Sequence, residues 1–224
     1  MCGRYTASWS KAQFEKTFNV QPPLFEGDTF ESYNIAPTTQ APIVRFSKGE
    51  REASLAKWGL IPKWVDKPLD FKANMFNARS ETILEKASFK RPFKSQRCLV
   101  PVSGFYEWRG KAGSKQPYHI RLGEDKPFAL AGVWDYWEKG DASITSYTII
   151  TTEASEQMQD IHHRMPVILP SEHFEDWLEP DSEPEMLTHF LEPFAGELDI
   201  YQVDKRVGSV RNNDAELVAP LNSK

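Results

Sequence analysis

The sequence predicts an α+β fold: a single domain, residues 1–224, whose mixed or antiparallel β-sheets form a barrel-like core flanked by short helices. Many short runs of β-branched and aromatic residues predict strands, while few segments show helical periodicity. The strands do not alternate regularly with helices, which argues against a parallel sheet built from βαβ units. At 224 residues the chain can bury one core, and no repeat or linker divides it.

The first predicted element is a helix that ends near Val20. Ser8 or Ser10 can cap its N-terminus, because a serine oxygen there accepts a backbone N–H that has no partner within the helix. Phe14 and Phe18 stand four residues apart and therefore fall on one face, which we expect to be buried.

Strands and three further helices are expected after this helix. Each predicted strand is a run rich in β-branched or aromatic residues. The runs are residues 41–46, 55–60, 98–108, 118–122, 128–134, 146–152, 166–169 and 199–203. Each later helix begins near a serine that can cap it. These helices are expected at 80–87, 171–178 and 183–191, behind Ser80, Ser171 and Ser182.

The composition is that of a soluble globular protein. Apolar residues make up 40% and charged residues 26%, and the longest apolar runs are far shorter than the roughly 20 residues of a membrane-spanning helix. The first residues show no signal peptide. We therefore expect a cytoplasmic protein with no membrane partner.

The two cysteines, Cys2 and Cys98, are too few for a disulfide framework, and a cytoplasmic compartment would keep both reduced. Cys98 lies in the apolar run RCLVPV and is interpreted as a core residue. The sequence has no CxxC or HExxH motif and no Cys/His cluster. We therefore expect no metal and no other cofactor.

Charge is distributed unevenly along the chain. Residues 171–200 hold ten acidic and no basic residues, and removing these ten from the net charge of −5 leaves +5 on the remainder. Residues 79–97 hold six basic residues against two acidic ones. This pattern fits a basic face beside an acidic one, and it equally fits two oppositely charged solvated surfaces.

Cys2 is the candidate reactive residue. A small penultimate residue normally allows Met1 to be removed, which would leave Cys2 with a free α-amine beside its thiol. With reference pKa values of about 8 for the amine and about 8.5 for the thiol, both groups are partly nucleophilic near neutral pH. An aldehyde would condense with the amine to a Schiff base, and thiol attack would close a five-membered thiazolidine ring. If Met1 is retained, Cys2 is instead a small residue of a first strand.

Three further side chains could assist this chemistry. Glu107 lies in GFYEW, and apolar surroundings would raise its pKa for acid–base work, unless it faces water from an edge strand. His162 and His163 precede a predicted strand, where neighbouring side chains face opposite ways, so we expect at most one to enter the site. The carboxamide of Asn77 could orient an imine or a sugar hydroxyl, or it could simply end a turn.

Arginines and aromatic residues near these groups predict a nucleic-acid partner. Arginines hold phosphates, and aromatic rings stack on bases or wedge between them. Three arginines lie within two residues of a candidate site residue: Arg4, Arg79 and Arg164. The candidate stacking or wedging residues are Trp58, Trp64, Trp108 and, in the turn YNIAPT, Pro37.

Six motifs stand in an order and spacing typical of one family: MCGRY, YNIAPT, WGLIPKW, NARSET, GFYEW and IHHRMP. From residue 2 to about 217, including the closing VGSVRNNDAEL, the sequence resembles the SOS-response-associated peptidase (SRAP) family. The resemblance implies a protein that senses abasic sites in single-stranded DNA and shields them through a thiazolidine cross-link. It also implies a self-cleavage that removes Met1, and an abasic-site lyase activity.

The resemblance assigns a role to each matching position. Cys2 is the cross-linking residue, and Asn77 steadies the reacting sugar. Glu107 is the acid–base glutamate, and His162 rather than His163 helps to form and reverse the bond. The residues implied to contact the flanking phosphates or to line the DNA path are Arg4, Arg79, Arg164, Pro37 and Trp108.

One position departs from the family pattern. Val65 follows Trp64 where some relatives carry a second aromatic residue, so only one ring of a wedge is expected at this turn. The expected partner remains single-stranded DNA that contains abasic sites, bound by a monomer.

Three other functions are alternatives to this one. An N-terminal-nucleophile glutamine amidotransferase would use the Cys2 thiol on a side-chain amide, but no downstream motif supports it. A non-covalent single-stranded DNA binding module would not need Cys2 at all. A papain-like protease would need a reactive thiolate at Cys98, which the apolar neighbours of this residue disfavour. Changing Cys2 to Ser separates the aldehyde trap from the binding module.

Overall fold

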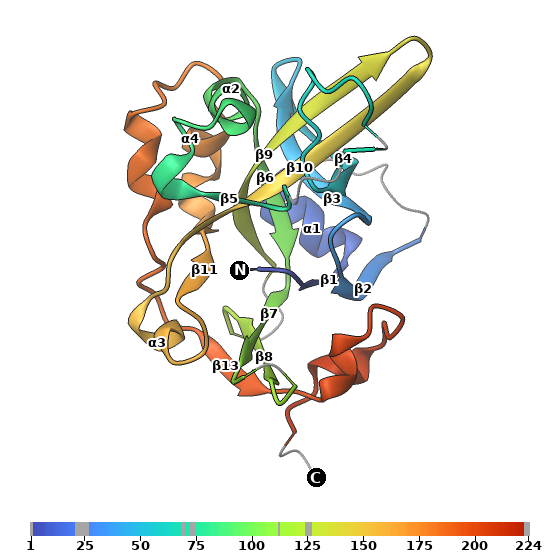
Figure 1. Cartoon of the computed structure of the whole chain (residues 1–224), viewed down its shortest axis with the longest axis vertical. Coiled ribbons are helices and arrows are strands. Elements are labelled where there is room, and N and C mark those ends of the chain that lie inside the picture. The colour runs from blue at the N-terminus through green and yellow to red at the C-terminus, as the bar shows by residue number, and fades with distance from the viewer. Residues whose placement is uncertain are drawn as a thin grey trace.

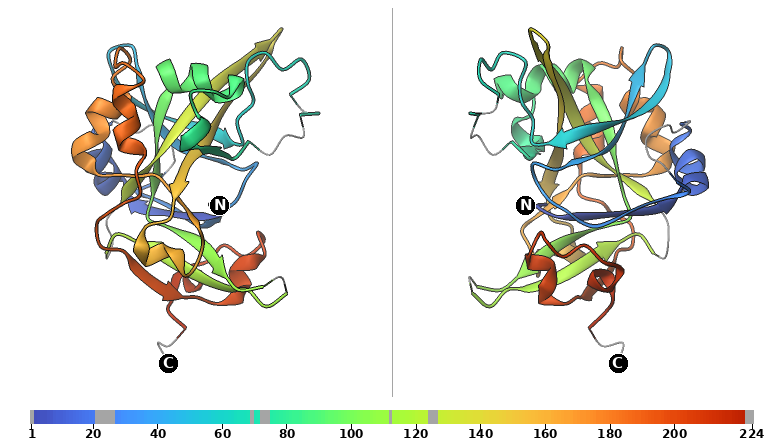
Figure 2. Two further views of the ribbon diagram at one scale, coloured as in Figure 1. Left: turned by 60° about the vertical axis from the view of Figure 1, so that its left-hand side comes forward. Right: turned by 90° about the vertical axis from the view of Figure 1, so that its right-hand side faces the viewer.

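The computed structural model describes residues 2–20, 27–68, 70–71, 75–111, 113–123 and 127–221, and within them the chain forms two β-sheets with short helices around them (Figure 1). The upper part of Figure 1 holds the larger sheet and most of the helices, and β7, β8 and β13 lie below. β1 begins near the centre of the molecule in Figure 1 and in the left view of Figure 2, and toward the left side in the right view of Figure 2.

The smaller sheet has five strands in the order β13-β8-β7-β1-β2, all paired antiparallel. In this order its strands are Asp199–Gln202, Gln116–Arg121, Gly104–Arg109, Tyr5–Ser10 and Thr29–Ile35. The central position of β1 and β7 brings the residues beside Cys2 and the residues around Glu107 into neighbouring strands.

The larger sheet closes on itself. Its order is β11-β10-β4-β3-β6-β9-β12, and an additional pairing of β9 with β10 turns five of these strands into a barrel. The barrel strands are β3 (Gln40–Ser47), β4 (Glu50–Trp58), β6 (Arg97–Val102), β9 (Phe128–Lys139) and β10 (Ala142–Glu153). β10 pairs in parallel with β4 and with β5 (Asn77–Arg79), so the sheet is mixed. The predicted α+β class with a barrel-like core is confirmed.

Every predicted strand corresponds to at least one strand of the structure, but two predicted strands are divided. The run 98–108 breaks at Ser103 into β6 and β7, which belong to different sheets. Gly104 begins β7 where a side chain cannot fit, because an added Cβ would lie 2.3 Å from Nε2 of His119. The run 166–169 likewise divides into β11 (Arg164–Pro166) and β12 (Ile168–Leu169). β1, β2 and β5 were not predicted.

The first helix is α1 (Lys11–Phe18), and Ser10 rather than Ser8 caps it. The Ser10 hydroxyl accepts the N–H of Gln13, and the Gln13 side chain accepts the N–H of Ser10, which completes a capping box. Phe14 and Phe18 are fully buried, as the periodicity predicted. Ser8 lies within β1.

The helix predicted at 80–87 is wrong. Residues Ser80–Thr82 form a single 3₁₀ turn, and the α-helix begins only at α2 (Ala87–Ser95). The Ser80 side chain makes no capping hydrogen bond. The end of α2 is held from outside the helix, since the guanidinium of Arg97 donates to the carbonyls of Phe93 and Lys94 at 2.8 and 2.6 Å.

The two later helices are confirmed in position but not in form. The first begins as a 3₁₀ turn, Ser171–His173, and continues as α4 (Phe174–Leu178). The second is a 3₁₀ helix, Met186–Leu191, and no serine side chain caps either one. A short α3 (Glu156–Gln159) and 3₁₀ turns at Lys205–Gly208 and Ala215–Val218 were not predicted.

One buried contact joins the two sheets close to Cys2. The hydroxyl of Tyr5 in β1 lies 2.6 Å from that of Tyr147 in β10, and both side chains are fully buried. Tyr5 also packs on Trp58 of β4, with ring centroids 5.1 Å apart. Among the described residues no helix is long and apolar enough to cross a membrane.

Candidate functional site

A cleft of about 650 Å³ gathers most of the predicted site residues. Its lining comes from both sheets and from three connecting segments, so no single stretch of sequence could form it. The lining residues are Arg4, Arg79, Glu107, Trp108, Lys115, His162, His163, Arg164 and Gly208.

Cys2 is buried beside this cleft, with no exposed surface. Its Sγ lies 3.9 Å from the carbonyl oxygen of Arg4. Burial raises the pKa of the Cys2 thiol far above its ordinary value, and the nearby charge of Glu107 raises it further. The thiol is therefore neutral at physiological pH and needs a proton acceptor before it can act as a nucleophile.

Asn77 is joined directly to Cys2. It begins β5, and its Nδ2 donates to the carbonyl oxygen of Cys2 at 2.8 Å. Its Oδ1 is buried and finds no hydrogen-bond partner within the described residues. A buried amide oxygen without a partner costs about 1–3 kcal/mol. Asn77 therefore holds the backbone of Cys2 and keeps one acceptor available next to it.

Glu107 is a buried carboxyl group in β7, with only 3% of its surface exposed. Its neighbours Phe105 and Tyr106 are fully buried, as GFYEW predicted, and the alternative of a water-facing edge glutamate is wrong. Burial raises the pKa of Glu107 from 4.5 to about 7. At neutral pH this carboxyl group can therefore both donate and accept a proton.

His162 and His163 both line the cleft, so the expectation that at most one would enter it is wrong. They lie in the turn between α3 and β11 rather than on a strand, and their rings stack with centroids 4.4 Å apart. Nδ1 of His162 lies 2.9 Å from the backbone nitrogen of Arg164 and 3.1 Å from its carbonyl oxygen, so the backbone of Arg164 holds this edge of the ring. Burial lowers the pKa of His162 to about 4, so the ring is neutral.

The three arginines differ in what they already bind. Arg4 donates at 2.7 Å to both Asn34 Oδ1 and the carbonyl of Val207. Arg164 is nearly buried, pairs with Glu81 through both carboxylate oxygens, and donates to the carbonyl of Thr151 at 2.6 Å. Arg79 is exposed, and no ion pair involving it occurs among the described residues.

The predicted stacking residues are dispersed. Trp108 lines the cleft, with the guanidinium of Arg4 6.0 Å from its ring centroid. Trp64 is 62% exposed on a loop away from the cleft lining, and Pro37 is half-buried in the turn between β2 and β3. Trp58 is fully buried in the core.

Cys98 is also a fully buried core residue, as predicted, and burial raises the pKa of its thiol far above the ordinary value. A reactive thiolate at this position is therefore disfavoured. Among the described residues no group of His, Cys, Asp and Glu side chains could hold a metal ion.

Sequence reasoning missed Lys115, Gly208 and Asn34. Lys115 precedes β8 and lines the cleft from the β7–β8 turn. The basic residues of that turn were the sequence feature that could have indicated it. Asn34 is buried at the end of β2, and its Nδ2 donates to the carbonyls of Val207, Ser209 and Asn212. Asn34 thereby holds the segment around Gly208 at the cleft. No local sequence pattern predicts this contact, because its partners lie more than 170 residues away in the sequence.

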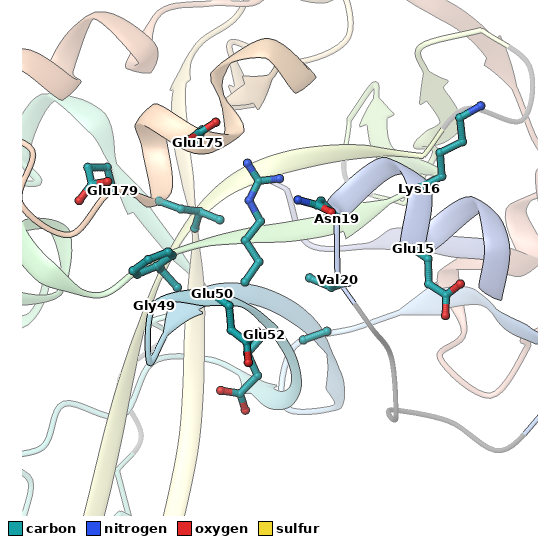
Figure 3. Close-up of a pocket in the computed structure, with 13 residues that line it drawn as sticks. Glu15, Lys16, Asn19, Val20, Gly49, Glu50, Glu52, Glu175 and Glu179 are labelled. Atoms are coloured by element: carbon teal, nitrogen blue, oxygen red, sulfur yellow. The ribbon is translucent and has the colours of Figure 1, made fainter.

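A larger cavity lies elsewhere, between α1, the β3–β4 hairpin and α4 (Figure 3). It measures about 1070 Å³, and acidic side chains dominate the charged groups around it. These acidic residues are Glu15, Glu50, Glu52, Glu175 and Glu179, against Lys16 and Arg51. This surface would repel phosphates. The acidic stretch 171–200 thus contributes to a surface distinct from the cleft. In the basic stretch 79–97, Arg97 is buried and adds no charge to the surface.

The comparisons agree with this arrangement. The model of the SOS response associated peptidase (SRAP) family matches residues 1–210. Abasic site processing protein YoqW of Bacillus subtilis is 39% identical over 223 residues, which cover 97% of this chain and 99% of that protein. Abasic site processing protein HMCES of Gallus gallus is 34% identical, covering 99% and 78%.

Solved structures share the fold as well. A crystal structure of a Bacteroides thetaiotaomicron protein superposes with a TM-score of 0.87 at 30% identity, covering 98% of this chain and 99% of that one. A Bordetella bronchiseptica protein superposes with a TM-score of 0.78 at 28% identity, covering 91% of this chain. With its family model, its relatives and its fold in agreement, this chain belongs to the SOS response associated peptidase (SRAP) family.

Proposed function

We propose that this protein processes abasic sites in single-stranded DNA by joining the aldehyde of the exposed deoxyribose to Cys2 as a thiazolidine. Removal of Met1 would first free the α-amine of Cys2. Relatives named as abasic site processing proteins support the substrate class. The product is a covalent DNA–protein link that shields the lesion.

One observation carries the proposal: Glu107 and His162 line one cleft, and Cys2 is buried where the charge of Glu107 acts on its thiol. Asn77 binds the carbonyl of Cys2 at 2.8 Å, and the charge of Glu107 acts on the Cys2 thiol. Glu107 and His162 line the same cleft. Such a convergence of a nucleophile, a carboxyl group with a raised pKa and a neutral imidazole is what aldehyde condensation requires.

Condensation begins with addition of the Cys2 amine to the aldehyde carbon, which gives a carbinolamine. Glu107 in its protonated form donates its proton to the carbinolamine hydroxyl, which leaves as water, and a C=N bond forms. The acceptor oxygen of Asn77 can hold a hydroxyl group of the sugar during this step. Glu107 is then a carboxylate.

Ring closure uses that carboxylate. It accepts the proton of the Cys2 thiol as sulfur attacks the carbon of the protonated imine. The C=N electron pair returns to nitrogen as the C–S bond forms, so the nitrogen keeps its proton and Glu107 is protonated again. His162, whose ring is neutral, is suited to move a proton to and from the sugar oxygen when the ring opens or the adduct reverses. The five-membered ring closes within one residue, where effective molarities reach about 10⁵ M or more.

Two side activities follow from the same groups. Hydrolysis of the Met1–Cys2 peptide bond would use the Cys2 thiol as nucleophile with Glu107 and His162 as proton carriers, which accounts for a self-cleaving peptidase. Lyase activity would arise if the Schiff base lost its 3′ phosphate by elimination before ring closure.

The test is a denaturing gel of the purified protein with single-stranded DNA that carries one abasic site. Intact DNA of the same sequence and the C2S variant are the matched controls, and mass spectrometry of the intact protein shows whether Met1 is removed. We expect a heat-stable shifted band that requires both the lesion and Cys2.

Two outcomes would reject the covalent proposal. If protein without Met1 forms no such band, the aldehyde is not trapped. If C2S forms the band as well as the wild type, a residue other than Cys2 makes the bond. Tight binding without a band would favour a non-covalent single-stranded DNA module, and glutamine hydrolysis would favour an amidotransferase.

A further inference from the structure

We propose that Lys115, on the turn between β7 and β8, binds a backbone phosphate and so positions the strand that enters the cleft. This inference rests on the proposed function, because it names a residue that places the DNA for that chemistry. Neither the family resemblance nor the motifs that carry it single out Lys115.

The cations of the cleft are not equally available. Four line it: Arg4, Arg79, Lys115 and Arg164. Arg4 and Arg164 are hydrogen-bonded to protein carbonyls and to Asn34 or Glu81, so part of the donor capacity of each guanidinium already serves the fold. Lys115 and Arg79 are exposed, and within the described residues neither forms an ion pair. Charges of this kind can bind phosphate at little structural cost.

The two available cations come from different sheets. Arg79 ends β5, which pairs with β10 of the barrel sheet, whereas Lys115 precedes β8 of the five-stranded sheet. Both border the same cleft as Glu107. A strand held at both residues would therefore pass the buried carboxyl group, which is the placement that condensation at Cys2 needs.

Lys115 lies on a turn that is rich in basic residues, and hydrogen bonding and backbone angles are described on both sides of residue 112. The β7–β8 hairpin, in light green, projects from the body of the molecule (Figure 2). Gly110 and Gly113 adopt positive φ values of 113° and 88°, and the N–H of Ser114 donates to the carbonyl of Lys111 at 3.1 Å. Residues 109–121 include four basic residues and no acidic one.

The field of Lys115 reaches the proposed chemical groups. Burial is the larger influence on both pKa values: it raises that of Glu107 and lowers that of His162. The charge of Lys115 opposes the rise at Glu107 and adds to the fall at His162. The Lys115 ammonium group therefore lies on the same cleft as the two residues and within electrostatic reach of both.

The experiment compares K115A with K111A in binding to intact single-stranded DNA, measured by fluorescence anisotropy across a range of salt concentrations. Lys111 is the matched control, since it is exposed on the same turn but does not line the cleft. We expect K115A to weaken binding by about threefold to tenfold and to reduce the slope of log affinity against log salt by about 0.7, the value for one contact on a single strand. K115R should restore both.

The inference is overturned if K115A binds like the wild type, or if K111A and K115A lose affinity and slope equally. Because this DNA carries no lesion, the result does not depend on adduct formation. Absence of a cross-linked band in the wild type would reject the proposed function, whereas an unchanged salt slope in K115A would reject the role of Lys115 alone.

Discussion

Burial gives the carboxyl group of Glu107 a pKa that suits the acid–base role proposed for it. Removing it from water penalises the charged form, and the resulting pKa of about 7 divides the group between its two protonation states at neutral pH. Burial also keeps the thiol of Cys2 protonated, so this candidate nucleophile needs a proton acceptor, and the carboxylate form of Glu107 can serve as one.

In the E107Q variant, the cross-linking rate should no longer fall as pH rises through about 7. In the wild type, the protonated carboxyl that starts condensation becomes scarce as pH rises through about 7, so its contribution falls above that pH. We expect E107Q to slow adduct formation by about 10²-fold or more at pH 6 and by much less at pH 9. Rapid-quench gels over this pH range measure the effect.

The same substitution has a built-in folding control. Because its pKa is raised from 4.5 to about 7 in the folded protein, Glu107 lowers stability as pH rises between these two values, and above about pH 7 the full cost is present; glutamine removes that cost. Thermal unfolding at pH 8 should therefore show E107Q to be no less stable than the wild type. A normal cross-linking rate in a folded E107Q protein would remove Glu107 from the mechanism.

At the scale of elements, β1 depends on a buried contact with the barrel. Tyr5 in β1 and Tyr147 in β10 share one hydrogen bond of 2.6 Å, and neither hydroxyl reaches water. β1 follows directly after the segment that carries Cys2 and Arg4, so this contact fixes the nucleophile relative to β10 and β5.

The Y5F variant should destabilise the protein by about 1–3 kcal/mol, because it leaves the hydroxyl of Tyr147 buried without its partner. The double variant Y5F/Y147F should cost less than the sum of the two single changes, since it removes both ends of the bond. Urea unfolding measures the free energies, with Y136F at an exposed position as the control. Additive single and double effects would show that the two hydroxyls do not stabilise each other.

The segment after β13 shows a second dependence between elements. Asn34 and Arg4 together bind the carbonyls of Val207, Gly208, Ser209 and Asn212, which brings the end of the chain to the edge of the cleft. Arg4 and Val207 are 203 residues apart in sequence. An arginine that sequence reasoning assigned to DNA is thus engaged in holding the fold.

At the scale of the whole molecule, closure of the barrel requires close approach of β6, β9 and β10. Gly132 in β9 pairs with Cys98 of β6 and with Ile149 of β10. A Cβ at this position would lie 2.9 Å from Val100 Cγ2 and 3.0 Å from both Cys98 Sγ and the carbonyl oxygen of Thr148. The interior of the barrel therefore has no room for a methyl group here.

The G132A variant should lower the free energy of unfolding by about 1–3 kcal/mol through overpacking. G208A is the matched control, because no atom lies within 4 Å of an added Cβ there, and its effect should stay within about 0.5 kcal/mol. Urea unfolding of both variants provides the measurement. Equal stability of G132A and the wild type would show that the barrel can expand at this point without cost.

The sequence by itself determined the features that depend on neighbouring residues. The Ser10 cap, the buried face of Phe14 and Phe18, and the central strands follow from local hydrogen bonding and periodicity. The apolar run around Glu107 was enough to predict a raised pKa, and six motifs together indicated the SRAP family. Local patterns failed at 80–87, where a serine followed by charged residues resembled a capped helix.

Only the tertiary structure decided the features that depend on distant partners. The division at Ser103 is a matter of pairing, because β6 pairs with β3 and β9 whereas β7 pairs with β1 and β8. The availability of Arg79 and Lys115, in contrast to Arg4 and Arg164, depends on which acceptors the fold brings near each one. Spacing along a chain reports periodicity over a few residues. Burial and pairing are set by segments up to two hundred residues away, so the electrostatics of the cleft could be derived only from the folded molecule.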